Sequence, residues 1–113
     1  MLARAQRITS ADDYKRVVRR GRRMSGANSV TYQLMNPNGG TPRFGFIVAK
    51  SVGNAVVRNR VRRRLKAVAY SIAPGLPDGV ETVFRALPPS ATADFAQLAA
   101  EVERSASRLA EKL

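Results

Sequence analysis

A stripe of apolar residues in the middle of the chain requires a long amphipathic helix that packs on a core. In and just beyond KSVGNAVVRNRVRRRLKAV, residues 50–68, apolar residues recur at spacings of four, four, three and four, the period of one helix face. Asn54 can cap the start of this helix, and Pro74 follows its end near Ile72. The stripe consists of Val57, Val61, Leu65, Val68 and Ile72.

The same helix carries more positive charge than folding explains. Six of the nine residues from Arg58 to Lys66 are cationic and none is acidic. Five like-charged pairs lie three or four residues apart, and at roughly 0.2–0.5 kcal/mol each they cost about 1–2.5 kcal/mol together. Burial of each stripe residue contributes roughly 1.5–3 kcal/mol at most, so the helix still forms. A polyanion bound to the outward face would explain the charge.

The chain as a whole is strongly basic. Its 113 residues carry a net charge of +12, with a pI of about 11.6. Fifteen of the twenty Lys and Arg residues lie in two blocks, 4–23 and 50–66, whereas residues 78–113 contain six acidic and four basic residues. This distribution favours nucleic acid as the partner, with an anionic membrane surface as the second choice, and a scaffold role for the C-terminal third.

The residue types that carry most enzyme chemistry are missing. Cysteine and histidine are absent and the eight acidic residues are scattered, which removes disulfides, thiolate catalysis, the commonest general base and the usual zinc ligands. The glycines form no phosphate-binding or dinucleotide-binding pattern. No apolar run approaches 18 residues, and no secretory signal is evident. We therefore expect a cytoplasmic protein with no catalytic residue, metal or cofactor of its own.

Local patterns predict a first helix and two strands before the basic helix. Ser10 is a good N-cap, and the first helix should run to about Arg20 and stop at Gly21. Residues 29–35 and 43–49 have the composition of strands. The turn-forming residues between these strands predict that they pair as an antiparallel hairpin. Tyr14, Val17 and Val18 form the apolar face of the first helix.

The remaining segments complete one compact α+β domain over residues 1–113. Residues 80–86 are predicted to be a strand, 88–90 a loop and 92–112 a helix. The order is then α-β-β-α-β-α. The last helix should bury Phe95, Leu98, Val102, Ala106 and Leu109.

RFGFIVAKSVGNAVVRNRVRRRLK, residues 43–66, resembles the signature of the bacterial ribonuclease P protein subunit. The core of that signature is an Arg-Asn-Arg triplet followed by basic residues, here 58–60. DYKRVVRRGRR, residues 13–23, resembles the first helix of the family, and VFRALPPSA, residues 83–91, its last strand and loop. The resemblance implies an α-β-β-β-α-β-α fold with a small mixed sheet and a left-handed βαβ crossover. One further short strand is therefore expected near 24–28.

The resemblance also implies a function and two sets of site residues. Ribonuclease P removes the 5′ leader of precursor tRNA, and its RNA subunit is the catalyst. The protein binds that RNA and grips the leader, with Mg²⁺ expected only through the RNA and no protein or membrane partner. The residues expected to bind the ribozyme RNA are Lys50, Arg58, Asn59, Arg60, Arg62, Arg63 and Lys66. Those expected to bind the leader are Tyr14, Val18, Tyr32, Ile47 and Ala49.

Several of these assignments have structural alternatives. Asn59 could bond to a neighbouring loop, and both Tyr14 and Tyr32 could be ordinary core residues. Val18 stands where the family often has a second aromatic residue, which weakens the inferred cleft. Arg85 matches an arginine of the family without an assigned role. The arginines at the end of the first helix could serve only to stabilise that helix through its dipole.

Two other classes of function compete with a ribonuclease P subunit. A ribosome-associated or other structural RNA-binding protein would have the same size and charge. A self-sufficient metal-dependent nuclease is disfavoured, because the chain lacks histidine and clustered acids.

Overall fold

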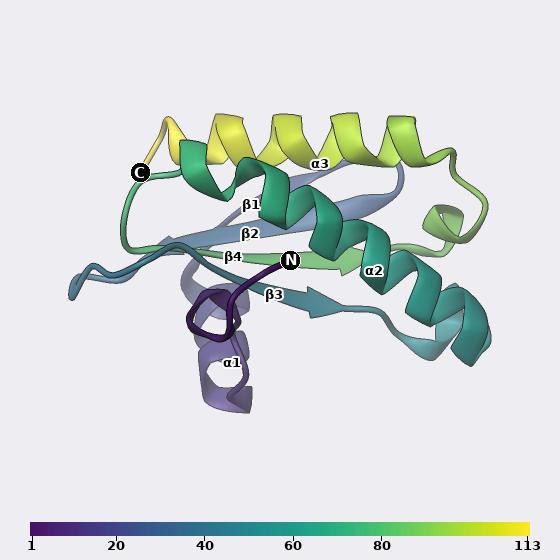
Figure 1. The fold of residues 1–113 in the computed structure, drawn as a ribbon, viewed down its shortest axis with the longest axis horizontal. Coiled ribbons are helices and arrows are strands. Elements are labelled where there is room, and N and C mark those ends of the chain that lie inside the picture. The colour runs from purple at the N-terminus through teal and green to yellow at the C-terminus, as the bar shows by residue number, and fades with distance from the viewer.

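The computed structural model describes all residues from Met1 to Leu113 as a four-stranded sheet between two layers of helices (Figure 1). The order α-β-β-β-α-β-α implied by the resemblance is confirmed. The additional strand, β1, begins slightly earlier than expected. No helix has the length and apolar character needed to cross a membrane. The elements are α1 (Ala11–Arg20), β1 (Arg22–Ser25), β2 (Ser29–Met35), β3 (Arg43–Ile47), α2 (Ala55–Ile72), β4 (Val80–Ala86) and α3 (Phe95–Ala110).

Both predicted helix caps are confirmed. The Ser10 hydroxyl accepts a hydrogen bond from the backbone N–H of Asp13 at 3.0 Å, and the Asn54 side chain accepts one from Val57 at 3.0 Å. After α1 the chain approaches itself closely at Gly21, where a Cβ would lie 2.4 Å from the Val17 carbonyl oxygen. Glycine is therefore required where α1 gives way to β1.

The predicted hairpin between β2 and β3 is wrong, because β4 lies between these strands. The sheet order is β1-β2-β4-β3, and β4 pairs antiparallel with β2 and parallel with β3. β4 is buried along almost its whole length, as expected of a central strand. The seven residues 36–42 form a longer connection than the two-residue turns that fix a hairpin.

The segment from β3 through α2 to β4 is a parallel βαβ unit. Its left-handed sense stays a prediction from the resemblance. β3 ends at Ile47 and not at Ala49 as predicted. The chain turns there into a single 3-10 turn, Lys50–Val52, that leads to α2.

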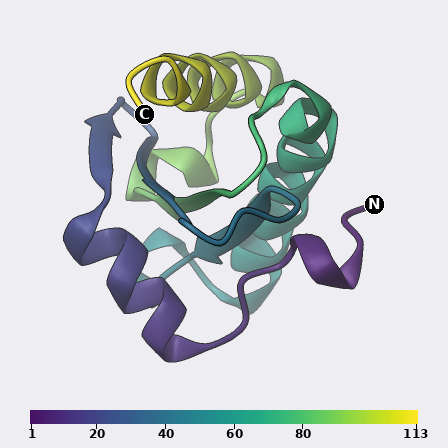
Figure 2. The ribbon, with the colours of Figure 1, turned by 90° about the vertical axis from the view of Figure 1, so that its left-hand side faces the viewer.

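Each face of the sheet has its own core, since α1 lies on one side and α2 and α3 lie on the other (Figure 2). On the α2–α3 side, the rings of Phe44 and Phe46 pack against Phe84, with centroids 6.2 and 6.1 Å apart. The smaller core under α1 consists of Ile8, Val17, Val30, Tyr32 and Val83.

Burial on both faces explains why the polar residues of β2 do not face solvent. Thr31 and Gln33 are fully buried under α3, and the Gln33 amide donates a hydrogen bond to the Ala106 carbonyl at 3.0 Å. α3 begins after Asp94, later than predicted, because a 3-10 turn occupies Pro88–Ala91. Four of the five predicted core residues of α3 are buried, but Phe95 is 40% exposed.

Candidate nucleic-acid interface

The outward face of α2 carries cationic side chains without carboxylate partners. All ion pairs of the structure involve Arg16 or Arg43, which lie on α1 and β3. The cations on the outward face of α2 are therefore available to an external anion, and several of them line a shallow depression of about 590 Å³. We call Arg58, Asn59, Arg62, Arg63 and Lys66 the α2 surface.

The members of the α2 surface differ in their exposure. Asn59, Arg63 and Lys66 are exposed, whereas Arg58 and Arg62 are half-buried. The Asn59 carboxamide oxygen accepts a hydrogen bond from the Arg62 guanidinium at 3.2 Å. Its partner is thus a cation of the same face and not a neighbouring loop. Lys50 is exposed on the 3-10 turn before α2.

Arg60 and Arg64 lie on the flank of α2, where they hold the connection between β4 and α3. Arg60 Nη2 donates to the Ala91 carbonyl at 2.9 Å, and Arg64 Nη1 donates to the Ala93 carbonyl at 3.3 Å. The Arg64 guanidinium also lies 5.7 Å from the centroid of the half-exposed Phe95 ring. The predicted contact of Arg60 with RNA is not tested by the structure. Its guanidinium already has a hydrogen-bond partner in the backbone.

Four of the five residues expected to bind the leader come together between α1 and the sheet. Tyr14, Val18 and Ile47 are half-buried around the core to which Tyr32 belongs. The Tyr14 hydroxyl accepts a hydrogen bond from the Phe46 N–H at 2.9 Å. Its ring covers Gly45, where a Cβ would lie 2.5 Å from the ring. Ala49 is exposed beyond the end of β3 and does not join this group.

Tyr32 is a core residue in the structure, and Arg85 covers its ring. Only 4% of Tyr32 is exposed, and the Arg85 guanidinium lies 5.5 Å from the ring centroid. Arg85 is in register with Val30 on one side and with Ile47 on the other, and it is itself half-buried. We call Tyr14, Val18, Ile47 and Arg85 the sheet surface. The resemblance singles out Arg85, but it does not predict that Arg85 lies over Tyr32. That position depends on the order of the strands in the sheet.

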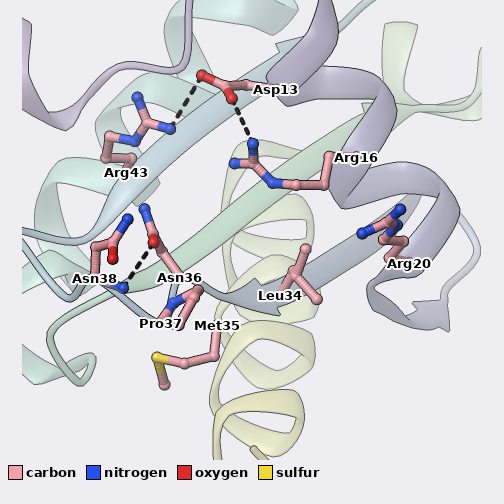
Figure 3. Close-up of a pocket in the computed structure, with 9 residues that line it drawn as sticks. All are labelled: Asp13, Arg16, Arg20, Leu34, Met35, Asn36, Pro37, Asn38 and Arg43. Carbon is pink, nitrogen blue, oxygen red and sulfur yellow. Dashed lines mark hydrogen bonds and ion pairs between the residues drawn. The ribbon is translucent and has the colours of Figure 1, made fainter.

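A buried ion network connects α1 to β3 and β4, and no sequence pattern predicts it. Glu81 is 1% exposed and accepts hydrogen bonds from Arg16, at 2.5 Å, and from Arg43. Asp13 binds the same two arginines at 2.7 and 3.2 Å (Figure 3). The only hint of this network in the sequence is that Glu81 is the single acidic residue of a strand that is otherwise mostly apolar.

The network changes the ionisation of its members. The hydrogen bond from Arg16 lowers the pKa of Asp13 below its ordinary value, against the effect of desolvation and with a further hydrogen bond from Arg43. The hydrogen bond to Glu81 raises the pKa of both Arg16 and Arg43. A groove of about 480 Å³ opens beside these residues, between Arg20 of α1 and the Asn36–Asn38 loop (Figure 3).

Comparisons with known proteins agree on one family. A family model described as Ribonuclease P matches residues 2–110. The ribonuclease P protein component of Clavibacter michiganensis is 51% identical over 88 residues, which cover 78% of each chain. That of Acidothermus cellulolyticus is 43% identical, with 96% of this chain and 92% of the relative covered.

Solved structures show the same fold. The Staphylococcus aureus RNase P protein superposes with a TM-score of 0.85 at 23% identity, covering 93% of this chain and 95% of that one. The Thermotoga maritima RNase P protein gives a TM-score of 0.76 at 17% identity, with 95% and 96% covered. Together with the sequence matches, these findings establish that the chain belongs to the ribonuclease P protein family.

Proposed function

We propose that this member of the family binds the catalytic RNA of ribonuclease P through the α2 surface. The observation that carries the proposal is a helix face with four cations and no carboxylate partner. The arginine guanidinium is planar and can donate two parallel hydrogen bonds to a phosphate. Asn59, held by Arg62, would help to fix the orientation of that guanidinium. Family membership supports this role over that of a ribosome-associated protein.

The sheet surface is our candidate for contact with the 5′ leader of precursor tRNA. Unpaired bases of RNA stack on aromatic rings or on arginine guanidinium planes. Because Tyr32 is covered, we assign the stacking contact to the Arg85 guanidinium, which Tyr32 supports and which is only half-buried. Tyr14, Val18 and Ile47 would contribute van der Waals contact beside it. The leader would thus meet Arg85 and not the Tyr32 ring itself.

In this proposal the protein supplies binding and the RNA supplies the chemistry. The two carboxylates of the ion network, Asp13 and Glu81, are engaged by Arg16 and Arg43, which makes them poor candidates for a general base. Mg²⁺ would reach the holoenzyme through the RNA. The particle would act in the bacterial cytoplasm, where precursor tRNA is processed.

Reconstitution with ribonuclease P RNA tests the proposal. The protein should raise the affinity of the RNA for precursor tRNA or lower its Mg²⁺ requirement, and the protein alone should cleave nothing. Loss of the stimulation in Arg62→Ala/Arg63→Ala, but not in Arg104→Ala/Arg108→Ala on α3, would support the α2 surface. Equal behaviour of the two variants would contradict it.

The leader contact has its own readout. Arg85→Ala should weaken binding of a precursor that carries a leader by roughly 1–3 kcal/mol, the range for one lost stack. It should leave the affinity for mature tRNA unchanged, since mature tRNA has no leader. If both affinities fall equally, Arg85 does not contact the leader.

A further inference from the structure

A second cationic face lies on the opposite side of the sheet from α2 (Figure 2). Lys15, Arg16, Arg19 and Arg20 of α1 line a depression of about 410 Å³ on the outward side of the helix, together with Asp12. Arg23 of β1 pairs with Tyr32 and therefore points to the same side of the sheet as α1. The α1 surface, as we name it, consists of Lys15, Arg19, Arg20 and Arg23, all of which are exposed.

The cations of the α1 surface have no carboxylate partner. Arg16 is paired with Asp13 and Glu81, whereas Asp12 forms no ion pair although it lines the same depression. The helix dipole favours cations in the last turn of α1, which accounts for Arg19 and Arg20. It does not account for Lys15 in the middle of the helix. Folding therefore leaves part of this charge unexplained.

The chemistry of the surface favours a phosphate backbone as the ligand. The large hydrophobic side chains that are exposed in the structure all lie outside α1 and β1. The surface thus offers no ring on which a base could stack and no apolar wedge for insertion into a membrane. Cations of this kind bind phosphates without reading sequence.

We propose that the α1 surface is a second RNA-backbone site, separate from the α2 surface and without base specificity. One protein molecule would then hold two RNA segments, one on each side of the sheet. This goes beyond the proposed function, which uses the α2 surface and the sheet surface only. Because the surface offers no ring on which unpaired bases could stack, we assign the second segment to a double-helical part of the catalytic RNA and not to the leader.

Counting bound RNA duplexes tests this proposal without either natural RNA. The probe is a 12-base-pair RNA duplex of arbitrary sequence, and native mass spectrometry at low salt gives the stoichiometry. The wild-type protein should bind two duplexes. The α1 variant, with Lys15, Arg19, Arg20 and Arg23 replaced by Gln, should bind one. The α2 variant, with Arg58, Arg62, Arg63 and Lys66 replaced by Gln, should also bind one.

A matched control removes four cations elsewhere. Arg4, Arg104, Arg108 and Lys112 are exposed and form no ion pair, and their replacement by Gln should leave two duplexes bound. Glutamine is a good helix former, so the variants should keep their helices. If the α1 variant does not fold, Arg19→Gln/Arg20→Gln replaces it and should weaken the second duplex at least fivefold. One duplex on the wild type, or two on a folded α1 variant, would overturn the proposal.

The source of the RNA is decided with natural partners. The catalytic RNA alone should bind the α1 variant at least tenfold more weakly than it binds the matched control. Weakening confined to long-leader precursors within the holoenzyme would place the leader on this surface and would overturn the assignment to the catalytic RNA. If the α1 variant binds both the catalytic RNA and long-leader precursors as tightly as the wild type does, the proposal is overturned. It is also overturned if the α1 surface binds anionic vesicles and not the duplex. Failure of precursor processing as such would instead count against the proposed function.

Discussion

The arginines around Glu81 and those on the α2 surface carry the same charge but differ in their partners. Arg16 and Arg43 share a carboxylate that is 1% exposed, so their charge is balanced inside the fold. Arg62 and Arg63 form no ion pair. The first pair holds α1 on the sheet, and the second is left for an external anion. Whether an arginine stabilises the fold or binds a ligand is therefore indicated by its partner in the structure and not by its charge.

The largest effect should come from removal of the buried carboxylate. Glu81→Ala removes the buried acceptor of Arg16 and Arg43 and leaves them only the more exposed Asp13, so it should lower the free energy of unfolding by about 3–5 kcal/mol. Denaturant unfolding measures this loss, and the exposed Glu103→Ala should stay within about 0.5 kcal/mol of the wild type. RNA affinity of the folded fraction should not change. A loss below about 1 kcal/mol would mean that the network contributes little to folding.

Tyr32→Ala should also act on stability. The side chain is 4% exposed, and loss of a large buried aromatic costs about 3–5 kcal/mol. The matched variant is Tyr70→Ala on α2, where the side chain is 54% exposed and the cost should be small. A folded, stable Tyr32→Ala protein that binds the leader poorly would restore the leader-binding role that the resemblance implies for this tyrosine.

Elements specified by near neighbours could be predicted from the sequence, and those specified by distant partners could not. Ser10 and Asn54 bond to residues three positions away, so the starts of α1 and α2 are visible locally. Arg60 and the Ala91 carbonyl are 31 positions apart, and Arg16 and Glu81 are 65 apart. These contacts follow from the insertion of β4 between β2 and β3, which no local pattern reveals.

Arg60 has features of both kinds of arginine, because it belongs to the basic helix but already has a partner within the fold. Its guanidinium donates to the Ala91 carbonyl, and a hydrogen bond from a charged group contributes roughly 1.5–3 kcal/mol. Since Arg60 is only half-buried, we expect Arg60→Ala to cost about 1–2 kcal/mol of stability. It should weaken RNA binding less than Arg63→Ala does, as thermal unfolding and filter binding would show. The opposite ranking would place Arg60 in the RNA contact.

The smallest expected effect is the pH dependence of the ion network. The Arg16 hydrogen bond holds the pKa of Asp13 below its ordinary value of 3.8, so the folded state binds that proton less tightly than the unfolded state. The contribution of Asp13 to stability is therefore complete above its unfolded pKa and is lost as pH falls through its folded pKa. Asp13→Asn should flatten the fall in unfolding free energy between about pH 5 and pH 2. Asp12→Asn is the matched control, because it removes the same charge from α1 without breaking an ion pair.

The salt dependence of binding to ribonuclease P RNA distinguishes a defined α2 surface from general attraction by the net charge. Each cation that meets a phosphate contributes about −0.9 to the slope of log affinity against log salt, with the duplex-DNA coefficient as a guide. The α2 variant lacks four cations, so its slope should be about 3–4 shallower than that of the matched control variant. Equal slopes for the two variants would show that general charge binds the RNA and would contradict a defined α2 surface.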